Sequence, residues 1–243
     1  MATNNGGAAE IVERLKHEEM VALPSLTREE LAVTGSLEAS PLGDVSEIEY
    51  WNGLDADARQ AATVAALRSL GARGLVDLDR AEPDASGGVA LNAAPELGVI
   101  LAARRQPAYV AVGSEPRQGL FGFVRLYGIL DEVRKLNLVL LERASPDGIH
   151  QFALCRPAKA ASEVSRWACG PATEAAVRTI EVIRPGKQGP HRQRLAVLIA
   201  ENGAQIADFD DEGDVKATRP ITEAALRERL RAILVKAGSL GTG

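Results

Sequence analysis

Short runs of apolar residues, separated by turn-forming residues, fill most of the chain after Pro107 and predict β-strands. Residues 145–148 (Ser-Pro-Asp-Gly) and 202–203 (Asn-Gly) have the composition of tight turns, which indicates antiparallel hairpins. Helices are expected at 157–167 and 222–235, so each run of four strands ends in one helix. The expected strands are 109–113, 120–128, 138–143, 149–154, 177–183, 192–200, 204–209 and 214–218.

The first 105 residues follow a different pattern, in which capping residues precede stretches with helical spacing. Thr27, with two glutamates shortly after it, predicts the start of one helix, and Asp55 predicts the start of a second that Gly71 ends. Pro95 suits the first position of a third helix, which continues to residue 105. The other expected elements are a charged helix at 10–19, an edge strand at 45–51, and a hairpin formed by 75–78 and 89–91.

Together these elements predict a mixed α+β fold. We interpret residues 25–168 as a first half, in which a helix-turn-helix-like region precedes a sheet and a helix. Residues 169–243 would form the second half, a sheet with a C-terminal helix. The halves are expected to be quasi-symmetric, each an antiparallel β-meander followed by a helix, after an N-terminal helical region. Residues 1–24 are expected to be a mobile segment with one short helix.

The composition agrees with a compact cytoplasmic protein. Of the 243 residues, 46% are hydrophobic, which is enough for a full core, and the net charge of −5 disfavours long-range attraction to phosphate. The two cysteines, Cys155 and Cys169, fit neither a redox pair nor a thiolate metal site, which favours a reducing compartment. No signal peptide is expected, and no apolar run approaches the roughly 20 residues that cross a bilayer.

The motifs of metal binding and catalysis are incomplete. Residues 208–213 begin like a calcium loop, but Arg219 stands where a bidentate glutamate is required. His150 and Cys155 are five residues apart on one expected strand, so their side chains would point to opposite faces. We therefore predict no catalytic, cofactor or metal site and no enzyme. The enzymatic alternative is a site assembled from dispersed acids such as Glu142 near His150.

A winged-helix DNA-binding regulator is the alternative function, because residues 57–91 have the order of a recognition helix followed by a hairpin wing. The expected wing at 77–84 carries four acidic residues against one arginine and would repel phosphate groups. Charge therefore disfavours nucleic acid as the partner. The helix and its end would offer Arg59, Arg68 and Arg73. Further basic residues, which more often mark a solvated loop than a groove, collect at Arg178, Arg184, Lys187, Arg192 and Arg194.

Four stretches resemble the EspG family, the cytosolic chaperones of type VII secretion in actinobacteria. They look like the family's first helix, its strand with a glycine turn and an arginine-bearing second helix, the Arg-Gly-Leu close of that helix, and an apolar helix. These stretches are 28–33, 49–59, 67–76 and 95–105. The two runs of meander and helix, ending near Trp167 and Val235, are similar to the family's two halves. Here only residues 168–176 join them, whereas the family has a sizeable helical segment.

The resemblance implies a fold without catalysis that holds a secretion substrate soluble through an exposed surface and loops. The partner would then be another protein, and a homodimer stays open. The contacts are expected in the loops at 114–119 and 184–191, although the composition of the first loop alone indicates only a turn. The candidate partner-binding residues are Glu115, Arg117, Gln118, Arg184, Lys187 and His191.

Overall fold

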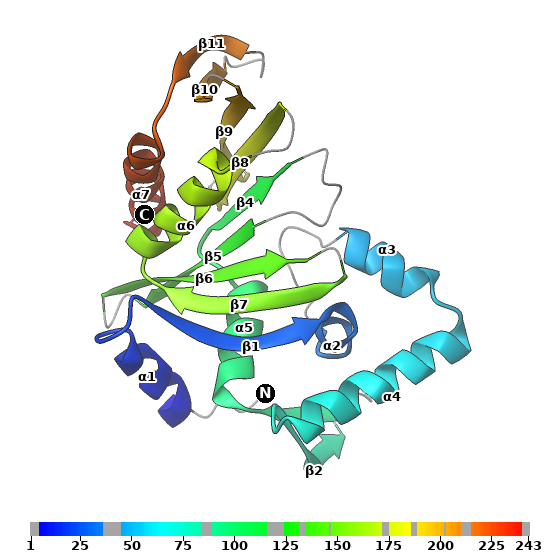
Figure 1. Ribbon diagram of the computed structural model, residues 1–243. Coiled ribbons are helices and arrows are strands. Elements are labelled where there is room, and N and C mark those ends of the chain that lie inside the picture. The colour runs from blue at the N-terminus through cyan, green and yellow to red at the C-terminus, as the bar shows by residue number, and fades with distance from the viewer. Residues whose placement is uncertain are drawn as a thin grey trace. The chain divides into compact units, whose positions relative to one another are not determined.

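The computed structural model describes residues 5–35, 45–83, 89–115, 124–131, 135–145, 147–171, 175–185, 189–201, 203–209 and 215–239 (Figure 1). Its helices are α1 (Asn5–Arg14), α2 (Arg28–Val33), α3 (Val45–Gly53), α4 (Ala56–Ala72), α5 (Pro95–Arg105), α6 (Pro157–Cys169) and α7 (Glu223–Ser239). Its strands are β1 (Met20–Thr27), β2 (Val76–Pro83), β3 (Val89–Ala93), β4 (Val110–Ser114), β5 (Val124–Asp131), β6 (Leu136–Ala144), β7 (Ile149–Cys155), β8 (Ala176–Arg184), β9 (His191–Ala200), β10 (Gly203–Phe209) and β11 (Val215–Pro220).

Within these residues, nine strands form one antiparallel sheet in the order β1-β7-β6-β5-β4-β8-β9-β10-β11, and β2 pairs with β3 separately. Seven helices accompany the sheets, so the predicted mixed α+β fold is confirmed. β4 and β8 are neighbours, and the meanders β4 to β7 and β8 to β11 extend from this pair in opposite directions. A quasi-symmetry between the two meanders stays a prediction.

The chain divides into two compact units. The first comprises Met1–Gln106 with Gly148–Phe152, and the second comprises Pro107–Asp147 with Ala153–Gly243. Within the first unit, the backbone N–H of Arg28 donates to the carbonyl oxygen of Gly148 at 3.1 Å. The division that the sequence suggests, at residues 24 and 168, stays a prediction.

The capping residues start their helices as the sequence predicts. Thr27 and Glu30 form a capping box, in which the threonine hydroxyl accepts from the Glu30 N–H and the Glu30 carboxylate accepts from the Thr27 N–H. The Asp55 carboxylate accepts from the N–H of Ala58 at 2.8 Å and starts α4. Pro95 occupies the first turn of α5, where its missing N–H costs no hydrogen bond.

The predicted edge strand at 45–51 is wrong, because these residues form the helix α3. Their alternation had no clean apolar face, whereas Val45 and Ile48 have the three-residue spacing of one helical face. The Tyr50 hydroxyl donates to the Glu29 carboxylate at 2.8 Å, and the Arg28 guanidinium lies 4.5 Å from the Tyr50 ring centroid. These contacts join α3 to α2, and such long-range contacts decide between strand and helix in a short segment.

The predicted mobile N-terminal segment is wrong for the residues that the structure describes there. Residues 5–14 form α1, earlier in the chain than the expected helix at 10–19, and β1 follows as an edge of the large sheet. Val21 and Leu26 of β1 are buried. Pro24 argues against a strand in the sequence, but an edge strand tolerates proline because one side of its backbone needs no partner.

In the second unit, α6 and α7 pack against each other on one face of the sheet (Figure 1). A Cβ atom on Gly113 of β4 would lie 2.7 Å from Cζ3 of Trp167, so the absence of a side chain there lets the indole of α6 approach the strand. The buried residues of α7 repeat every three or four positions, which is the spacing of one helical face. They are Leu226, Leu230, Leu234 and Ala237.

The hairpin between β9 and β10 forms as predicted, but its turn is one residue earlier than the Asn-Gly pair suggests. Ala200 pairs with Gly203, so the loop positions are 201 and 202, and Asn202 lies outside the described residues. Gly203 has a φ of +107°, a backbone conformation that favours glycine.

Candidate functional site

The two loops that the sequence predicts as contact regions begin at opposite ends of one strand. In the β4–β8 ladder, Ser114 lies opposite Thr179, and Val110 lies opposite Ile183. The first loop therefore begins near the start of β8, whereas the second begins after Arg184 at its end. The five residue steps from Thr179 to Arg184 span about 17 Å, at about 3.4 Å per residue. The beginnings of the loops do not form one patch.

Glu115, a predicted contact residue, lies inside the second unit. Its side chain is 6% exposed, and its Oε2 lies 2.7 Å from Nε of Arg178, whose side chain is 5% exposed. A buried carboxylate is unfavourable unless it is paired, so this ion pair compensates both charges. Glu115 therefore anchors the start of the loop from inside.

Arg178 also holds the end of α6. Its Nη1 donates to the carbonyl oxygens of Trp167 and Gly170, the latter at 2.8 Å, and its guanidinium carbon lies 5.6 Å from the Trp167 ring centroid. The last carbonyl groups of a helix have no partner within the helix, and a cation there is favourable with the helix dipole. Arg178, which the sequence groups with exposed basic residues, is a buried structural residue.

The β8–β9 hairpin brings Arg184 and His191 together. They lie directly opposite each other in the ladder, with His191 exposed and Arg184 partly buried. On the other face of the hairpin, the Glu181 carboxylate lies 3.2 Å from Arg192 and 3.4 Å from Arg194. The two arginine side chains are 57% and 55% exposed. One carboxylate cannot balance two cations, so this face keeps an excess of positive charge.

The remaining predicted contact residues, Arg117, Gln118 and Lys187, lie outside the described residues, as do positions 210–214 of the calcium-like stretch. Arg219 is exposed on β11 opposite Ile206. In the part of the chain that the structure describes, no three His, Cys, Asp or Glu residues form a group that could hold a metal ion.

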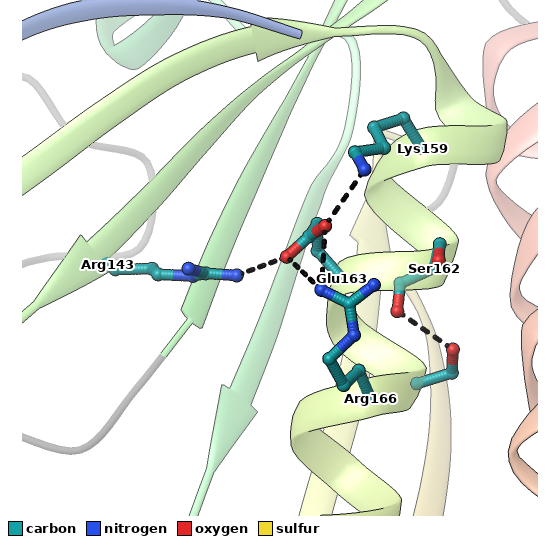
Figure 2. A network of polar contacts seen from close by, with 6 residues as sticks. Arg143, Lys159, Ser162, Glu163 and Arg166 are labelled. Carbon is teal, nitrogen blue, oxygen red and sulfur yellow. Dashed lines mark hydrogen bonds and ion pairs between the residues drawn. The ribbon is translucent and has the colours of Figure 1, made fainter. Parts of the chain in front are cut away.

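Three cations surround Glu163 of α6, and we call these four residues the Glu163 cluster (Figure 2). Arg143 of β6 contacts Oε2 through Nη2 at 2.5 Å, while Lys159 and Arg166 each approach Oε1 at 3.2 Å. The Glu163 side chain is 6% exposed, whereas those of Arg143 and Arg166 are 46% and 61% exposed. The cluster therefore presents cations at the surface around a carboxylate that is largely covered.

The cations of this cluster keep the Glu163 carboxylate ionised. Burial alone would raise the pKa of Glu163, but hydrogen bonds from Lys159 and Arg143 and the charge of Arg166 outweigh it and lower the pKa from its ordinary 4.5. Near neutral pH the cluster thus combines one negative charge with three positive ones.

Cys155 lacks the properties of a nucleophile. Its side chain is fully buried, and its Sγ donates to the carbonyl oxygen of Val139 at 3.7 Å. Burial raises the pKa of the thiol to about 12, so it is protonated near neutral pH. Since the thiolate is the reactive form of cysteine, this environment opposes catalysis by Cys155.

Glu142, which the enzymatic alternative invokes, is fully buried within the second unit. Its carboxylate accepts a hydrogen bond from the Tyr127 hydroxyl at 2.8 Å and lies 3.7 Å from Nη1 of Arg125. In the first unit, His150 is 1% exposed, and its ring stacks on Phe152 with centroids 6.4 Å apart. Each residue is therefore packed in the interior of its unit.

Two of the three arginines that DNA binding would use are engaged inside the first unit. Nη2 of Arg73 lies 2.7 Å from the Glu30 carboxylate, which also takes part in the capping box of α2. Nη2 of Arg59 donates to the Leu54 carbonyl oxygen at 3.0 Å, at the start of its own helix. Arg68 remains exposed on α4. These contacts weaken the DNA-binding alternative.

A hollow of about 570 Å³ also lies in the first unit, bordered by the end of α4, the β2–β3 hairpin and the start of α5. Leu78 on its wall is 40% exposed. The lining is mainly apolar, with Asp77 and Asn92 among its polar groups. It is a recess for an apolar group rather than a grouping of reactive side chains.

A comparison with known protein families and with curated proteins finds no match for the chain. In the described part of the chain, no helix combines the length and the apolar character that crossing a membrane requires. The functional interpretation therefore rests on the geometry of the chain itself.

Sequence reasoning missed the Glu163 cluster, although part of its signal was present. Lys159 and Arg166 lie four residues before and three residues after Glu163, the spacings at which side chains meet on a helix. The helix itself was predicted. The approach of Arg143 depends on how α6 packs on β6, which no local pattern indicates.

Proposed function

We propose that this chain is a non-catalytic adaptor or chaperone of the EspG type that binds another protein in the cytoplasm. The observation that carries the proposal is the strand order. Two antiparallel meanders extend from the β4–β8 pair, each is followed by a helix, and α6 and α7 pack together. This is the layout on which the resemblance to that family rests, and it places long sheet surfaces and loops where a partner can bind.

The β8–β9 hairpin is the surface that we assign to the partner. It carries the predicted contact residues Arg184 and His191 opposite each other, and Arg192 and Arg194 are more than half exposed on the other face. Val177 on β8 is 45% exposed. Exposed arginines beside apolar positions are typical of protein interfaces, in which arginine is enriched.

The charge distribution supports a protein partner over DNA. Arg59 and Arg73 are used inside the first unit, which leaves Arg68 as the exposed arginine of the proposed recognition helix. A helix with one exposed arginine provides few of the phosphate contacts from which DNA affinity arises.

The test is a capture experiment with the immobilised chain in an extract of the native host, read by mass spectrometry. We expect a protein in stoichiometric amount with the wild type, and at least about tenfold less with the double variant Arg192→Gln and Arg194→Gln, since interface arginines often dominate binding. Arg68→Gln is the matched control and should recover the same protein as the wild type.

Failure to recover any stoichiometric protein would contradict the proposal. So would salt-sensitive shifts of genomic DNA fragments that Arg68→Gln abolishes, because they would assign the function to α4.

A further inference from the structure

The Glu163 cluster has more positive charge than its carboxylate requires. The Oε1 atom is approached by Lys159 and Arg166, and Oε2 by Arg143 and Arg166, so both carboxylate oxygens have two cationic neighbours. One cation would balance the charge of Glu163. The other two leave a local charge of +2 on a chain whose net charge is −5.

The two arginines keep donor groups for another acceptor. In the contacts with Glu163, Arg143 uses Nη2 and Arg166 uses Nη1, whereas each guanidinium carries five N–H donors. Figure 2 shows Arg143 reaching Glu163 from the sheet and Arg166 reaching it from the next turn of α6. Because these side chains are 46% and 61% exposed, their outer N–H groups can bind a group that arrives from solvent.

The helix α6 holds this arrangement in place. Its buried positions include Ala160, Ala161 and Val164, and the fixed end at Trp167 is bonded to Arg178. Glu163 itself, ionised and largely buried, orients the arginines toward each other. A group of cations that a buried carboxylate has already ordered loses less conformational freedom on binding than free surface arginines do.

We propose that the Glu163 cluster binds the carboxylate of an acidic side chain in the partner protein. The inference rests on the proposed function, because it names the kind of segment that the adaptor holds. Arginine forks match carboxylate geometry and form charge-assisted hydrogen bonds with it. An isolated acidic segment is favoured over nucleic acid because an extended polyanion would meet the negative charge of the rest of the chain.

The experiment measures binding of a fluorescein-labelled peptide of ten glutamates to the full chain by fluorescence anisotropy at low salt. Arg166→Gln should weaken binding by about tenfold, the effect of losing a charge-assisted hydrogen bond. Arg231→Gln is the matched control, because Arg231 also forms an exposed ion pair with a glutamate three residues earlier and is 55% exposed. It should leave the affinity unchanged.

Glu163→Gln gives a second, opposite expectation. Removing the competing carboxylate while keeping the three cations should strengthen peptide binding about threefold or more, as expected when a repulsive charge is lost. A purely structural cluster would not bind more tightly without its central carboxylate. Thermal unfolding of each variant establishes that it is folded before binding is compared.

Three results would overturn the inference: no binding by the wild type, equal losses for Arg166→Gln and Arg231→Gln, or tighter binding of a DNA oligonucleotide at Arg166. A wild-type dimer that disappears in Arg166→Gln, seen by sedimentation without peptide, would also overturn it by identifying a second copy as the occupant. Peptide binding does not depend on the host extract, so its failure is distinguishable from failure of the capture experiment.

Discussion

The carboxylate of Glu115 and the guanidinium of Arg178 lie 2.7 Å apart in the interior of the second unit, 63 residues apart in the chain. The pair ties the residue after β4 to β8, and Arg178 extends the contact to the end of α6. A loop that the sequence suggests as a contact surface therefore begins from a rigid, charged attachment point. This attachment leads to the first prediction.

Replacing Arg178 with glutamine should destabilise the protein strongly. The variant leaves Glu115 buried without its cation and removes the donor at the end of α6, and breaking a buried pair in this way costs about 3–5 kcal/mol. Adding Glu115→Gln should restore part of the loss, since no buried charge then remains. Urea unfolding of both variants measures the effect. A loss no larger than that of the exposed-pair variant Arg231→Gln, about 0–1 kcal/mol, would contradict the prediction.

The contribution of Glu163 to stability should depend on pH. Its folded-state pKa lies below the ordinary value of 4.5, so the ionised form stabilises the fold above that value and the contribution is lost as the pH falls through the folded-state pKa. Unfolding free energies of the wild type and Glu163→Gln should therefore differ at pH 7 and converge below pH 4.5. Urea titrations at several pH values provide the measurement, and a constant difference down to pH 3 would show the interpretation to be wrong.

The two cysteines should differ in reactivity. Cys155 is fully buried, with a thiol pKa raised to about 12, so iodoacetamide should modify it only when the protein unfolds. Cys169 is partly exposed, and although burial also raises its pKa, it should react first in the native state. Mass spectrometry of alkylated peptides at pH 8, with and without urea, distinguishes the two sites. Rapid native labelling of Cys155 would contradict this packing.

Two glycine-to-alanine variants should change stability in opposite directions. At Gly113 a Cβ atom would lie 2.7 Å from the Trp167 ring, so the variant should lose about 1–3 kcal/mol through overpacking. At Gly98 in α5 a Cβ atom meets nothing within 4 Å, so the variant should gain up to about 1 kcal/mol from helix propensity. Urea unfolding of both proteins is the measurement, and a loss at Gly98 would count against the helical environment described for it.

Local signals determined much of the architecture from the sequence alone. Thr27, Asp55 and Pro95 predict helix starts because each acts on backbone groups within a few residues. The strands from β4 to β11 were expected near their observed positions, since alternating or apolar runs between turns carry that information locally. These features give the mixed α+β class.

Only the tertiary structure decided the remaining features, because they depend on contacts between distant residues. The helix α3 is joined to α2 through Tyr50 and Glu29, and the edge strand β1 contains a proline that local reasoning reads as a break. The burial of Glu115 against Arg178 and the approach of Arg143 to Glu163 follow from strand register and helix packing. The sequence by itself thus determined the kinds of elements and the supply of charged residues. Packing decided which of those charges are buried as structural pairs and which remain at the surface for a partner.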